Sequence, residues 1–580
     1  MPNHEPQEED FSFNSYFVPF TTLKAIHWII IIGLVIFANM LFNGFIWDDK
    51  TYILFNPDVQ AFNVDNLIKT NIFNAGGQYR PIPAIYFAVL VSLFKNTTFF
   101  YHFLQLLIHI ANTCLLFLVF TKFFGKTSSF FLSLLFLIHP IQVESVSYIS
   151  ASGNPLFFLF GILAVLLSFH KRISWKRASV IALLLLLSLL TKEAGIIFIF
   201  VVFFYKLLFI RRGIGTLFLA ECVSLLLYLV IRFGIGGVYF TKLPLIPIAK
   251  IPFAERLLNI PAVIFYYLKT IFFPLKLAID QQWVISTTTF QNFYFPLFLD
   301  TVFFICIVII GFYIYKVNKE NIKKYLFFLG WFIAGIFLYL QLFPLDGTVA
   351  DRWFYFPFVG LLGIITVSIQ SIRIISKSLQ KAGYIFIVIM LVFLAVRTIV
   401  RNSNWSDPIT LYTHDTQISD NFDIENNLGT EYSNIKDYPK AIEHSKKSVE
   451  MFPYEANLYN LANTYEQSKN IPEAKKYYAK ALTYPTYLPI NHNHFLVTYI
   501  RLAYMMYLSG EYNNAKQVIN QGLQEYSTSG YLWIELAACE YKLGHQEEAL
   551  QASEKAKVQL SNQQVEYFYN QITHNQLIQL

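Results

Sequence analysis

The sequence predicts an all-α protein: a polytopic membrane bundle of about eleven spans, followed by a C-terminal α-solenoid of helical repeats. Three observations predict this class: a lipid-compatible composition, a series of long apolar runs, and a repeat of about 34 residues near the C-terminus. Hydrophobic residues make up 55% of the 580 residues and charged residues 14%, against roughly 25% charged in a typical soluble domain. So much apolar surface has to be solvated by lipid, which excludes a soluble enzyme and a disordered scaffold.

Apolar runs long enough to cross about 30 Å of hydrocarbon recur from residue 22 onward. The predicted spans are 22–43, 98–122, 127–139, 154–170, 177–191, 193–209, 215–234, 298–316, 325–343, 353–372 and 383–400. The run 127–139 is short and crosses only if the bilayer thins locally. The acidic N-terminal segment, residues 1–20, lacks the basic flank of a secretory signal, so the first span is predicted to be uncleaved.

Basic clusters near the span ends predict the orientation, because Lys and Arg flanking a span stay cytoplasmic. The clusters are Lys122/Lys126, Lys171/Arg172/Lys176/Arg177, Arg211/Arg212, Lys316/Lys319/Lys323/Lys324 and Arg373/Lys377/Lys381. With all five inside, the N-terminus is cytoplasmic and everything after residue 401 lies on the outer side. That side is periplasmic or extracellular in a bacterium and lumenal in the endoplasmic reticulum of a eukaryote. The same alternation predicts that segments 81–95 and 255–276 lie in the outer interface, with a re-entrant loop as the alternative for the second.

Charge separates two predicted domains, residues 1–403 and residues 404–580. Residues 1–400 carry 30 of the 44 Lys and Arg and 17 of the 37 Asp and Glu. The rest of the chain carries 14 basic and 20 acidic side chains, so a basic membrane half precedes an acidic soluble half. An acidic soluble domain argues against nucleic acid as a partner, because phosphate binding needs positive charge. The four widely spaced cysteines predict neither a disulfide framework nor a zinc site.

Small residues recur at regular spacing in the soluble half. They are Ala441, Ala474, Ala515 and Ala549, separated by 33, 41 and 34 residues. About 34 residues is the tetratricopeptide period, and small residues at these positions let the two helices of a unit pack closely. The sequence therefore predicts about four such repeats, with an insertion at YPTYLPINHNH. Arrays of this kind form concave surfaces that hold extended peptides or partner proteins.

Two adjacent aspartates, Asp48 and Asp49, follow the first predicted span. Paired carboxylates at a membrane boundary cost solvation free energy unless a cation, a proton or a substrate compensates. A carboxylate here is suited to take a proton from an acceptor hydroxyl, and the pair is alternatively suited to hold a divalent cation through oxygen ligands. The plainer alternative is a polar helix cap in a solvated loop. Asp48 is preferred to Asp49 as the base.

Four further motifs fall on the predicted outer face. They are Tyr79-Arg80, His139 with Glu144 in the loop HPIQVESVSYISASGN, Lys192-Glu193 and Asp351-Arg352. Each motif has a structural alternative: a snorkelling arginine, a histidine that stops a helix, a self-neutralising pair between two spans, and an internal ion pair. Arg352 is also suited to fork to a phosphate with two parallel hydrogen bonds.

All five motifs share one side of the membrane, although the orientation was assigned from basic clusters elsewhere. Together they predict an active site that opens outward and meets lipid. Glu221 and Asp300, which fall inside or at the start of predicted spans, are not assigned to this site.

Six segments, taken in order, resemble the transmembrane-and-tetratricopeptide O-mannosyltransferase family and its bacterial relatives, which are glycosyltransferases of the GT-C fold. The segments are FIWDDKTYILFNPDV, QYRPIPAIYFAVLVSLF, FLIHPIQVESVSYIS, LLTKEAG, ADRWFYFPFVG and RNSNWSDPITLYTHDT. The resemblance covers nearly the whole chain, and the segments are specific in combination.

The resemblance implies an enzyme that takes a sugar from a polyprenyl-phosphate carrier, typically dolichyl-phosphate mannose. The sugar passes to a Ser or Thr hydroxyl of an exported protein, with inversion at the anomeric carbon. The repeats would hold that protein. Asp48 or Asp49 matches the position of the presumed base, and Arg352, which follows an acid, matches the group expected to hold the carrier phosphate. The HP-x-x-x-E and K-E elements of the family match His139 with Glu144 and the pair at 192–193. The lipid-linked donor is a substrate, and no cofactor is expected unless the two aspartates hold a metal.

Two departures separate this chain from the family pattern. The loop after the His-Pro element reads SGNP at residues 152–155, where relatives usually carry a charged stretch. The acid before Arg352 is Asp rather than the more common Glu, which is a conservative change.

Three other functions compete with a protein glycosyltransferase. A GT-C enzyme that decorates a lipid-linked or cell-surface glycan would need the same site, and the repeats would then recruit an assembly partner. A non-catalytic membrane scaffold would use the repeats alone. A transporter is disfavoured, because the polar groups gather at one face rather than near mid-membrane.

Overall fold

The computed structural model describes residues 20–69, 77–239, 246–279, 281–372, 377–484 and 493–560. The regular secondary structure among these residues is helical, with no β-strand beyond an isolated bridge between Gln281 and Val349. The all-α prediction is confirmed. The chain forms two compact units that divide between Ile418 and Ser419. The boundary predicted from the sequence, between residues 403 and 404, falls instead at the end of helix α18.

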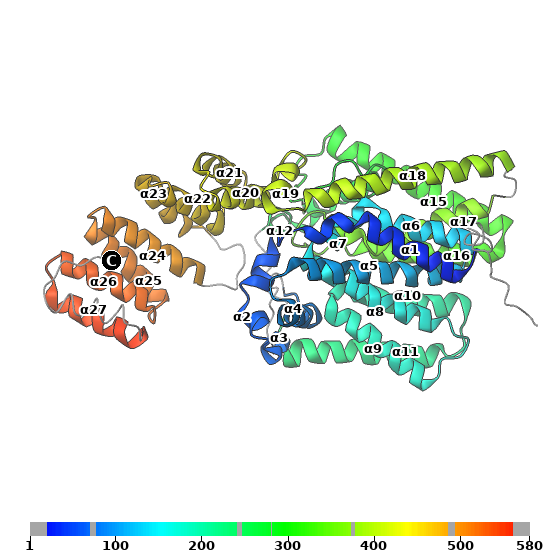
Figure 1. Cartoon of the computed structure of the whole chain (residues 1–580), viewed down its shortest axis with the longest axis horizontal. Helices are drawn as coiled ribbons and strands as arrows, with labels where there is room; N and C mark the ends of the chain where they lie inside the picture. Colours follow the sequence, from blue (N-terminus) through cyan, green and yellow to red (C-terminus); the bar gives the residue numbers. More distant parts are fainter. Residues whose placement is uncertain are drawn as a thin grey trace, which may run out of the picture. The chain divides into compact units, whose positions relative to one another are not determined.

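The first unit is a bundle of helices that run back and forth (Figure 1). Its longer helices are α1 (Thr22–Ile36), α4 (Pro81–Phe94), α5 (Thr98–Thr121), α6 (Lys126–Ile138), α8 (Gly153–Ser168), α9 (Trp175–Thr191), α10 (Ile196–Phe209), α11 (Ile214–Val230), α14 (Ile260–Phe272), α15 (Phe295–Val317), α16 (Lys319–Phe337), α17 (Pro357–Gln370) and α18 (Lys377–Asn404). The shorter ones are α2 (Pro57–Gln60), α3 (Val64–Lys69), α7 (Val143–Ser147), α12 (Pro247–Lys250), α13 (Phe253–Leu257) and α19 (Pro408–Thr416). Each of the eleven predicted spans coincides with one of the longer helices.

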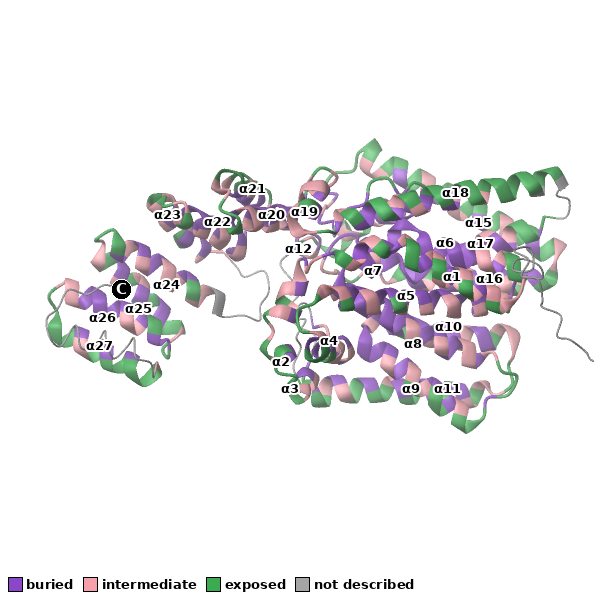
Figure 2. Cartoon of the chain, viewed as in Figure 1, coloured by how far each residue is buried: buried purple, intermediate pink, exposed green. Residues whose placement is uncertain are grey.

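Five helices among the described residues are long and apolar enough to cross a membrane. They are Thr98–Thr121, Ile149–Ser168, Ile214–Ile235, Phe290–Val317 and Lys381–Asn404. A sixth candidate is the pair Lys126–Ile138 and Pro140–Ser147, which bends by 52°. Figure 2 shows α18 exposed along much of its length, as expected of a helix that faces lipid. The number of eleven spans and their orientation remain predictions.

Short 3₁₀ turns, rather than long loops, join several helices of the bundle. Four of them carry the predicted motifs or lie beside them: Pro140–Gln142, Ile149–Ser152, Glu193–Gly195 and Asp351–Phe354. A 3₁₀ turn is tight and commonly begins or ends an α-helix, so it places its side chains at a helix terminus. The predicted interfacial segment 81–95 forms α4, which Pro81 begins. The segment 255–276 is broken into α13 and α14.

Aromatic side chains fill the interior of the bundle, and glycines allow its helices to approach. Phe123, Phe327 and Phe328 pack against one another with ring centroids 5.1–5.2 Å apart. A Cβ on Gly360 of α17 would lie 2.4 Å from the backbone nitrogen of Phe332 in α16. Small residues therefore set the distance between these two helices, as is common where helices pack inside membranes.

The described residues of the second unit form four successive helix pairs, which can be followed in Figure 1. Its helices are α20 (Phe422–Asn434), α21 (Tyr438–Met451), α22 (Glu455–Gln467), α23 (Ile471–Ala481), α24 (Asn493–Leu508), α25 (Tyr512–Glu525), α26 (Gly530–Lys542) and α27 (Gln546–Gln559). The four predicted alanines are all fully buried, which confirms the predicted packing of small residues in each pair. Most of the predicted insertion falls on residues 485–492, outside the described residues.

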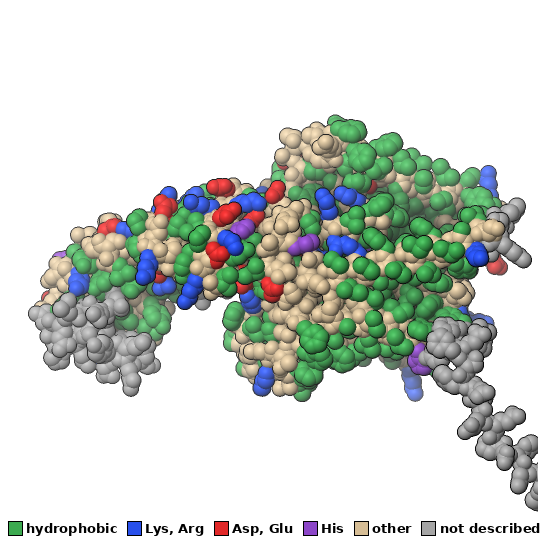
Figure 3. All heavy atoms as spheres, turned by 45° about the horizontal axis from the view of Figure 1, so that its top comes forward, with side chains coloured by type: hydrophobic (Ala, Val, Ile, Leu, Met, Phe, Trp, Pro, Cys, Tyr) green, Lys and Arg blue, Asp and Glu red, His purple; other side chains and the backbone are tan. Residues whose placement is uncertain are grey.

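Surface composition differs between the two units. In Figure 3, apolar side chains cover most of the visible face of the first unit, while Lys, Arg, Asp and Glu gather over the helices of the second. This contrast follows the division of charge seen in the sequence. An apolar exterior is suited to lipid, and a mixed charged exterior is suited to water.

The close approach at Gly360 generates a stability prediction. Gly360→Ala is expected to lower the free energy of unfolding by about 1–3 kcal/mol, because the new methyl group meets backbone atoms that cannot rotate away. Gly383→Ala in α18 is the matched control, since nothing lies within 4 Å of its added Cβ. Thermal unfolding of the purified protein in detergent measures both. Equal midpoints for the two variants would contradict the packing described here.

Candidate active site

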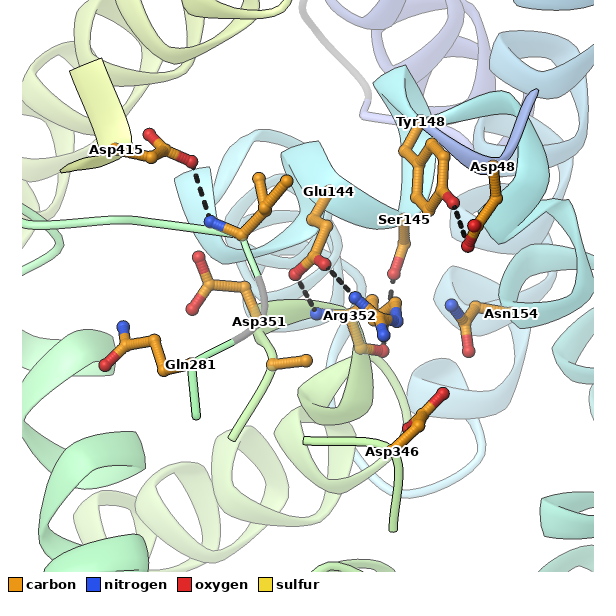
Figure 4. Close-up of polar contacts among 12 residues, drawn as sticks. Asp48, Glu144, Ser145, Tyr148, Asn154, Gln281, Asp346, Asp351, Arg352 and Asp415 are labelled. Atoms are coloured by element: carbon orange, nitrogen blue, oxygen red, sulfur yellow. Dashed lines mark hydrogen bonds and ion pairs between the residues drawn. The ribbon is translucent and has the colours of Figure 1, made fainter. Parts of the chain in front are cut away.

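The five outer-face motifs, which the sequence spreads over about 300 residues, meet around one cavity of the first unit. Its empty volume is about 570 Å³, the open mouth included. The lining residues are Asp48, Tyr52, Gln78, Arg80, Pro83, Tyr148, Ser150, Ala151, Gly153, Asn154, Lys192, Asp346 and Arg352. Asp48, Arg80, Lys192 and Arg352 were all predicted site residues. Figure 4 shows how Asp48, Asp346 and Arg352 lie relative to one another.

Asp48 presents a carboxylate to this cavity. It follows Trp47, whose φ of 54° turns the chain sharply after the first helix, and whose ring stacks on Tyr148 at 5.6 Å. The Tyr148 hydroxyl donates a hydrogen bond of 2.8 Å to Asp48 Oδ2. Burial raises the pKa of Asp48 to about 6, although the Tyr148 hydrogen bond and the Arg352 charge oppose the shift. At neutral pH the Asp48 carboxylate is mostly ionised. Because its pKa is raised, it is a stronger base than an ordinary carboxylate.

Asp49 does not line the cavity and has a different role. Its Oδ2 accepts a hydrogen bond of 3.0 Å from the backbone N–H of Ile46. Its Oδ1 accepts from the backbone N–H of Ser150 at 2.7 Å and from the Ser150 hydroxyl at 2.5 Å. Burial raises its pKa to about 7. Asp49 therefore ties the first loop to the turn at Ser150, and Asp48 is the better placed of the two aspartates to meet a substrate.

Arg352 is held at the cavity by Glu144. A guanidinium nitrogen of Arg352 pairs with Glu144 Oε1, and its backbone N–H donates to Oε2 at 2.9 Å. The guanidinium carbon also lies 5.8 Å from the ring centroids of Trp47 and Trp353, a cation–π distance. Glu144 itself is buried. The predicted internal pair of Arg352 with its neighbour Asp351 is replaced by this pair with Glu144.

Arg80 is held in the same way by Glu193. Its Nε donates to Glu193 Oε2 at 2.9 Å, and the backbone N–H of Tyr79 donates to Oε1 at 2.8 Å. The guanidinium of Arg232, at the end of α11, lies 3.7 Å from the same Oε1. One carboxylate thus holds two arginines, and only Arg80 reaches the cavity lining.

Lys192 completes a group of three cations around the cavity. Its Nζ donates a hydrogen bond of 2.5 Å to the side-chain oxygen of Asn154. Burial and, to a smaller extent, the charges of Arg80 and Arg352 lower the pKa of Lys192 to about 7. Among the described residues, Lys192 and Glu193 do not form the predicted self-neutralising pair, because Glu193 pairs with the two arginines instead. A bound anion would relieve the repulsion among the three cations.

The remaining predicted site residues serve the architecture. His139 Nδ1 accepts a hydrogen bond from the Ile141 N–H, and its Nε2 lies 2.9 Å from the Ile271 carbonyl oxygen. His139 therefore ends helix α6, which is the structural alternative given for it above. The Tyr79 hydroxyl donates to the Ile68 carbonyl at 2.8 Å. Asp351 is buried and accepts from the Tyr266 hydroxyl at 2.7 Å, and burial together with the Glu144 charge raises its pKa. None of these three lines the cavity.

Several residues that line the cavity, or hold a group that lines it, were missed by the sequence analysis. Asn154 belongs to the SGNP segment, which had been noted only as a departure from the family pattern. Asp346 is an acid in a predicted outer loop, so the argument used for Asp48 applied to it as well. Arg232 lies at a predicted span end, and nothing in the sequence separates it from a snorkelling arginine. Tyr148 carries no signal that distinguishes it from the other 36 tyrosines.

Glu221 and Asp300, which were not assigned to the site, lie away from it. Glu221 Oε1 and both carboxylate oxygens of Asp300 are buried without a hydrogen-bond partner among the described residues. Asp300 lines an apolar groove between α14 and α15. Neither lines the cavity that holds Asp48.

The donor set at the two aspartates fits a divalent cation poorly. Each oxygen of Asp49 already accepts a hydrogen bond from the chain, and the cavity beside Asp48 is lined by three cations. No group of three or more His, Cys, Asp or Glu side chains in the described segments is arranged to hold a metal ion. A metal site would normally gather several oxygen ligands.

These features define a helical membrane-type bundle whose cavity combines two carboxylates with three cations, joined in sequence to a repeat unit. A sequence profile described as Tetratricopeptide repeat matches residues 456–485. The protein O-mannosyl-transferase TMTC3 of Mus musculus is 24% identical over 559 residues, covering 86% of this chain and 58% of the relative. TMTC3 of Homo sapiens is 24% identical, covering 79% and 55%. The protein O-mannosyl-transferase F38B6.6 of Caenorhabditis elegans is 24% identical, covering 69% and 59%.

The resemblance predicted from the six segments is therefore confirmed. The chain spans a little over half the length of these relatives. Among solved structures, the P58(IPK) TPR domain aligns at 11% identity over 69% of this chain and 93% of that one, with a TM-score of 0.20. A score this low does not bear on the fold.

The separate roles of the two aspartates generate a prediction. Asp49→Ala is expected to lower the free energy of unfolding by about 1–3 kcal/mol, because it leaves the buried donors of Ile46 and Ser150 without an acceptor. Asp48→Ala removes a single hydrogen bond at an open cavity and is expected to cost less. Thermal unfolding of both variants in detergent measures the difference. A larger loss for Asp48→Ala would reverse the assignment.

Proposed function

We propose that this protein is a membrane glycosyltransferase that moves a mannose-like sugar from a polyprenyl-phosphate carrier to Ser or Thr hydroxyls of exported proteins, with inversion. The observation that carries the proposal is the composition of the cavity. The carboxylate of Asp48 shares it with the cations Arg80, Lys192 and Arg352, and with a second carboxylate, Asp346. Asp48 and the cations are the groups that transfer from a phosphate leaving group requires.

The three cations suit the phosphate of the carrier. Arg80 and Arg352 are each paired with a carboxylate of the chain, Glu193 and Glu144, so they are already oriented before a substrate arrives. Preorganised cations stabilise the negative charge that develops as the bond to a leaving group breaks. Because a phosphate leaves readily, the site needs no acid to protonate it.

The reaction exchanges one glycosidic bond for another. The acceptor hydroxyl oxygen attacks the anomeric carbon of the sugar from the face opposite the phosphate, and Asp48 takes the hydroxyl proton. The bond between the anomeric carbon and the phosphate oxygen breaks, and the electron pair leaves with the polyprenyl phosphate. The products are the glycosylated protein and the carrier phosphate, and one displacement of this kind inverts the anomeric centre.

The sugar and the acceptor are proposed from the similar proteins and the second unit. The relatives are named protein O-mannosyl-transferases, which supports mannose and a protein acceptor. The helix hairpins of residues 422–559 suit an extended polypeptide, because stacked repeats form a concave surface. A protein acceptor held beside the site would raise its effective concentration. We propose that the site and the repeats lie on the outer side of the membrane, as the basic clusters of the sequence predict.

Replacing Asp48 tests the proposal directly. Asp48→Asn is expected to reduce sugar transfer by about 10²–10⁴-fold, the usual contribution of a general base, while thermal unfolding stays unchanged. The assay uses the full chain in detergent, a labelled short-chain polyprenyl phosphate mannose and a Ser/Thr-containing peptide. Asp65→Asn is the control, because Asp65 is an exposed partner of Lys69 and does not line the cavity. Transfer that survives Asp48→Asn would refute the base, and absence of transfer by the wild type from any polyprenyl-phosphate sugar would favour a scaffold.

The two perturbed pKa values predict a narrow pH optimum. Asp48 must be ionised to accept a proton, so kcat/KM is expected to fall as the pH drops below about 6. Lys192 must be protonated to attract phosphate, so kcat/KM is expected to fall as the pH rises above about 7. The fall at low pH is the acidic limb of the profile and the fall at high pH is the alkaline limb. Because kcat/KM reports the ionisations of the free enzyme, both limbs reflect pKa values of the protein before the donor binds.

Lys192→Arg separates the two limbs. Arginine stays charged throughout this range, so the variant is expected to keep the acidic limb and lose the alkaline one. Steady-state kinetics between pH 5 and pH 9, within the range where the protein stays folded, measures both profiles. An unchanged alkaline limb in the variant would show that another group controls it.

A further inference from the structure

Asp346 is a second carboxylate on the wall of the cavity and has no role in the proposed chemistry so far. It lies in the loop between α16 and the 3₁₀ turn that carries Arg352, and Figure 4 shows it apart from Asp48, with Arg352 and Asn154 between them in the view. Within the described segments its side chain makes no hydrogen bond or ion pair, whereas Glu144 and Glu193 each hold an arginine. Its carboxylate is therefore available to a ligand.

The backbone on both sides of Asp346 is nevertheless tightly held. The side-chain amide of Gln341, a buried residue with a φ of 59°, donates to the carbonyls of Gly347 and Thr348 at 2.8 and 2.9 Å and accepts from the Leu345 N–H. The Gln282 side chain donates to the carbonyl of Asp346 itself at 2.9 Å. An acid on a fixed loop that leaves its carboxylate unpartnered is preorganised for a substrate group.

The charges around the cavity limit what that group is. The phosphate belongs near the cations, and Asp346 is an anion that would repel it. A metal ion is disfavoured by the three cations in the same lining. A neutral group that donates hydrogen bonds fits best, because an ionised carboxylate accepts hydrogen bonds and donates none. In a sugar phosphate, such groups are the hydroxyls of the sugar ring.

We infer that Asp346 accepts hydrogen bonds from ring hydroxyls of the sugar being transferred, and so helps to decide which sugar the site accepts. The inference rests on the proposed function, since it concerns the sugar of that donor. Two adjacent hydroxyls can be held by the two oxygens of one carboxylate. The sugar must lie between the phosphate and the acceptor hydroxyl, and Asp346 and Asp48 line the same cavity as the phosphate-binding cations.

Donors that lack single hydroxyls test the contact. The full chain in detergent is assayed with short-chain polyprenyl phosphate mannose and with its 2-, 3-, 4- and 6-deoxy forms. For the complete donor, Asp346→Ala is expected to lower kcat/KM by about 10–100-fold, the loss expected for a hydrogen bond to a charged group. A deoxy donor that lacks a contacted hydroxyl is expected to narrow the difference between wild type and variant, to less than about threefold where Asp346 holds that hydroxyl alone, because the contact is then already missing. Intrinsic reactivity cancels, since both proteins are compared on the same donor.

Two variants guard against indirect effects. Asp346→Asn keeps the side-chain volume and is expected to show the same donor dependence with a smaller loss. Asp58→Asn removes a charge outside the cavity lining, where its carboxylate accepts from Asn63 and Asn66, and is expected to behave as wild type on every donor.

The outcomes separate this inference from the function on which it rests. An equal loss for Asp346→Ala on all five donors would overturn the sugar contact and leave the transfer reaction standing. A variant that only shifts the pH profile of kcat/KM, through the effect of the lost charge on Asp48, would also overturn the sugar contact and leave the transfer reaction standing. No transfer by the wild type from any of the donors would overturn the proposed function, and the sugar contact with it.

Discussion

Two carboxylates, the buried Glu144 and the partly exposed Glu193, hold the charged centre of this protein in place. Each pairs with an arginine that reaches the cavity, Arg352 and Arg80, and each also accepts a backbone N–H. In an apolar helix bundle an unpaired charge is expensive, so the position of each arginine is dictated by the acid that neutralises it. The cavity exists in its present form because these pairs join segments that are distant in the sequence.

The second constraint is the shape of the helix ends. Tight 3₁₀ turns at Glu193–Gly195 and Asp351–Phe354 replace flexible loops and carry site residues directly on rigid helices. Asp49 adds a further tie by accepting three hydrogen bonds from Ile46 and Ser150. Functional groups on such supports lose little freedom when a substrate binds, because they are already ordered. The bundle thus fixes the positions of the site side chains. The repeat unit has a surface of the kind that suits polypeptides.

The sequence predicted for a physical reason that these charged groups lie together. Basic clusters predict the sides of the membrane, and that prediction puts the five motifs on one side. Asp48, Arg80, Lys192 and Arg352 do share one cavity. The same reasoning could not tell Asp48 from Asp49, or recognise His139 as a helix stop, because adjacent residues look alike until the chain's turn assigns their directions. It overlooked Asp346, whose outer loop offered the same argument as that of Asp48.

Composition and periodicity by themselves determined the helical class, the positions of the membrane-type helices and the four repeats, since burial of apolar faces acts locally along the chain. Only the tertiary structure decided which acid pairs with which base. Arg352 pairs with Glu144 and not with its neighbour Asp351, and Glu193 with two arginines and not with Lys192. Pairing depends on distances across the bundle, because electrostatic attraction in a dry interior acts between groups that packing brings together, whatever their separation in sequence.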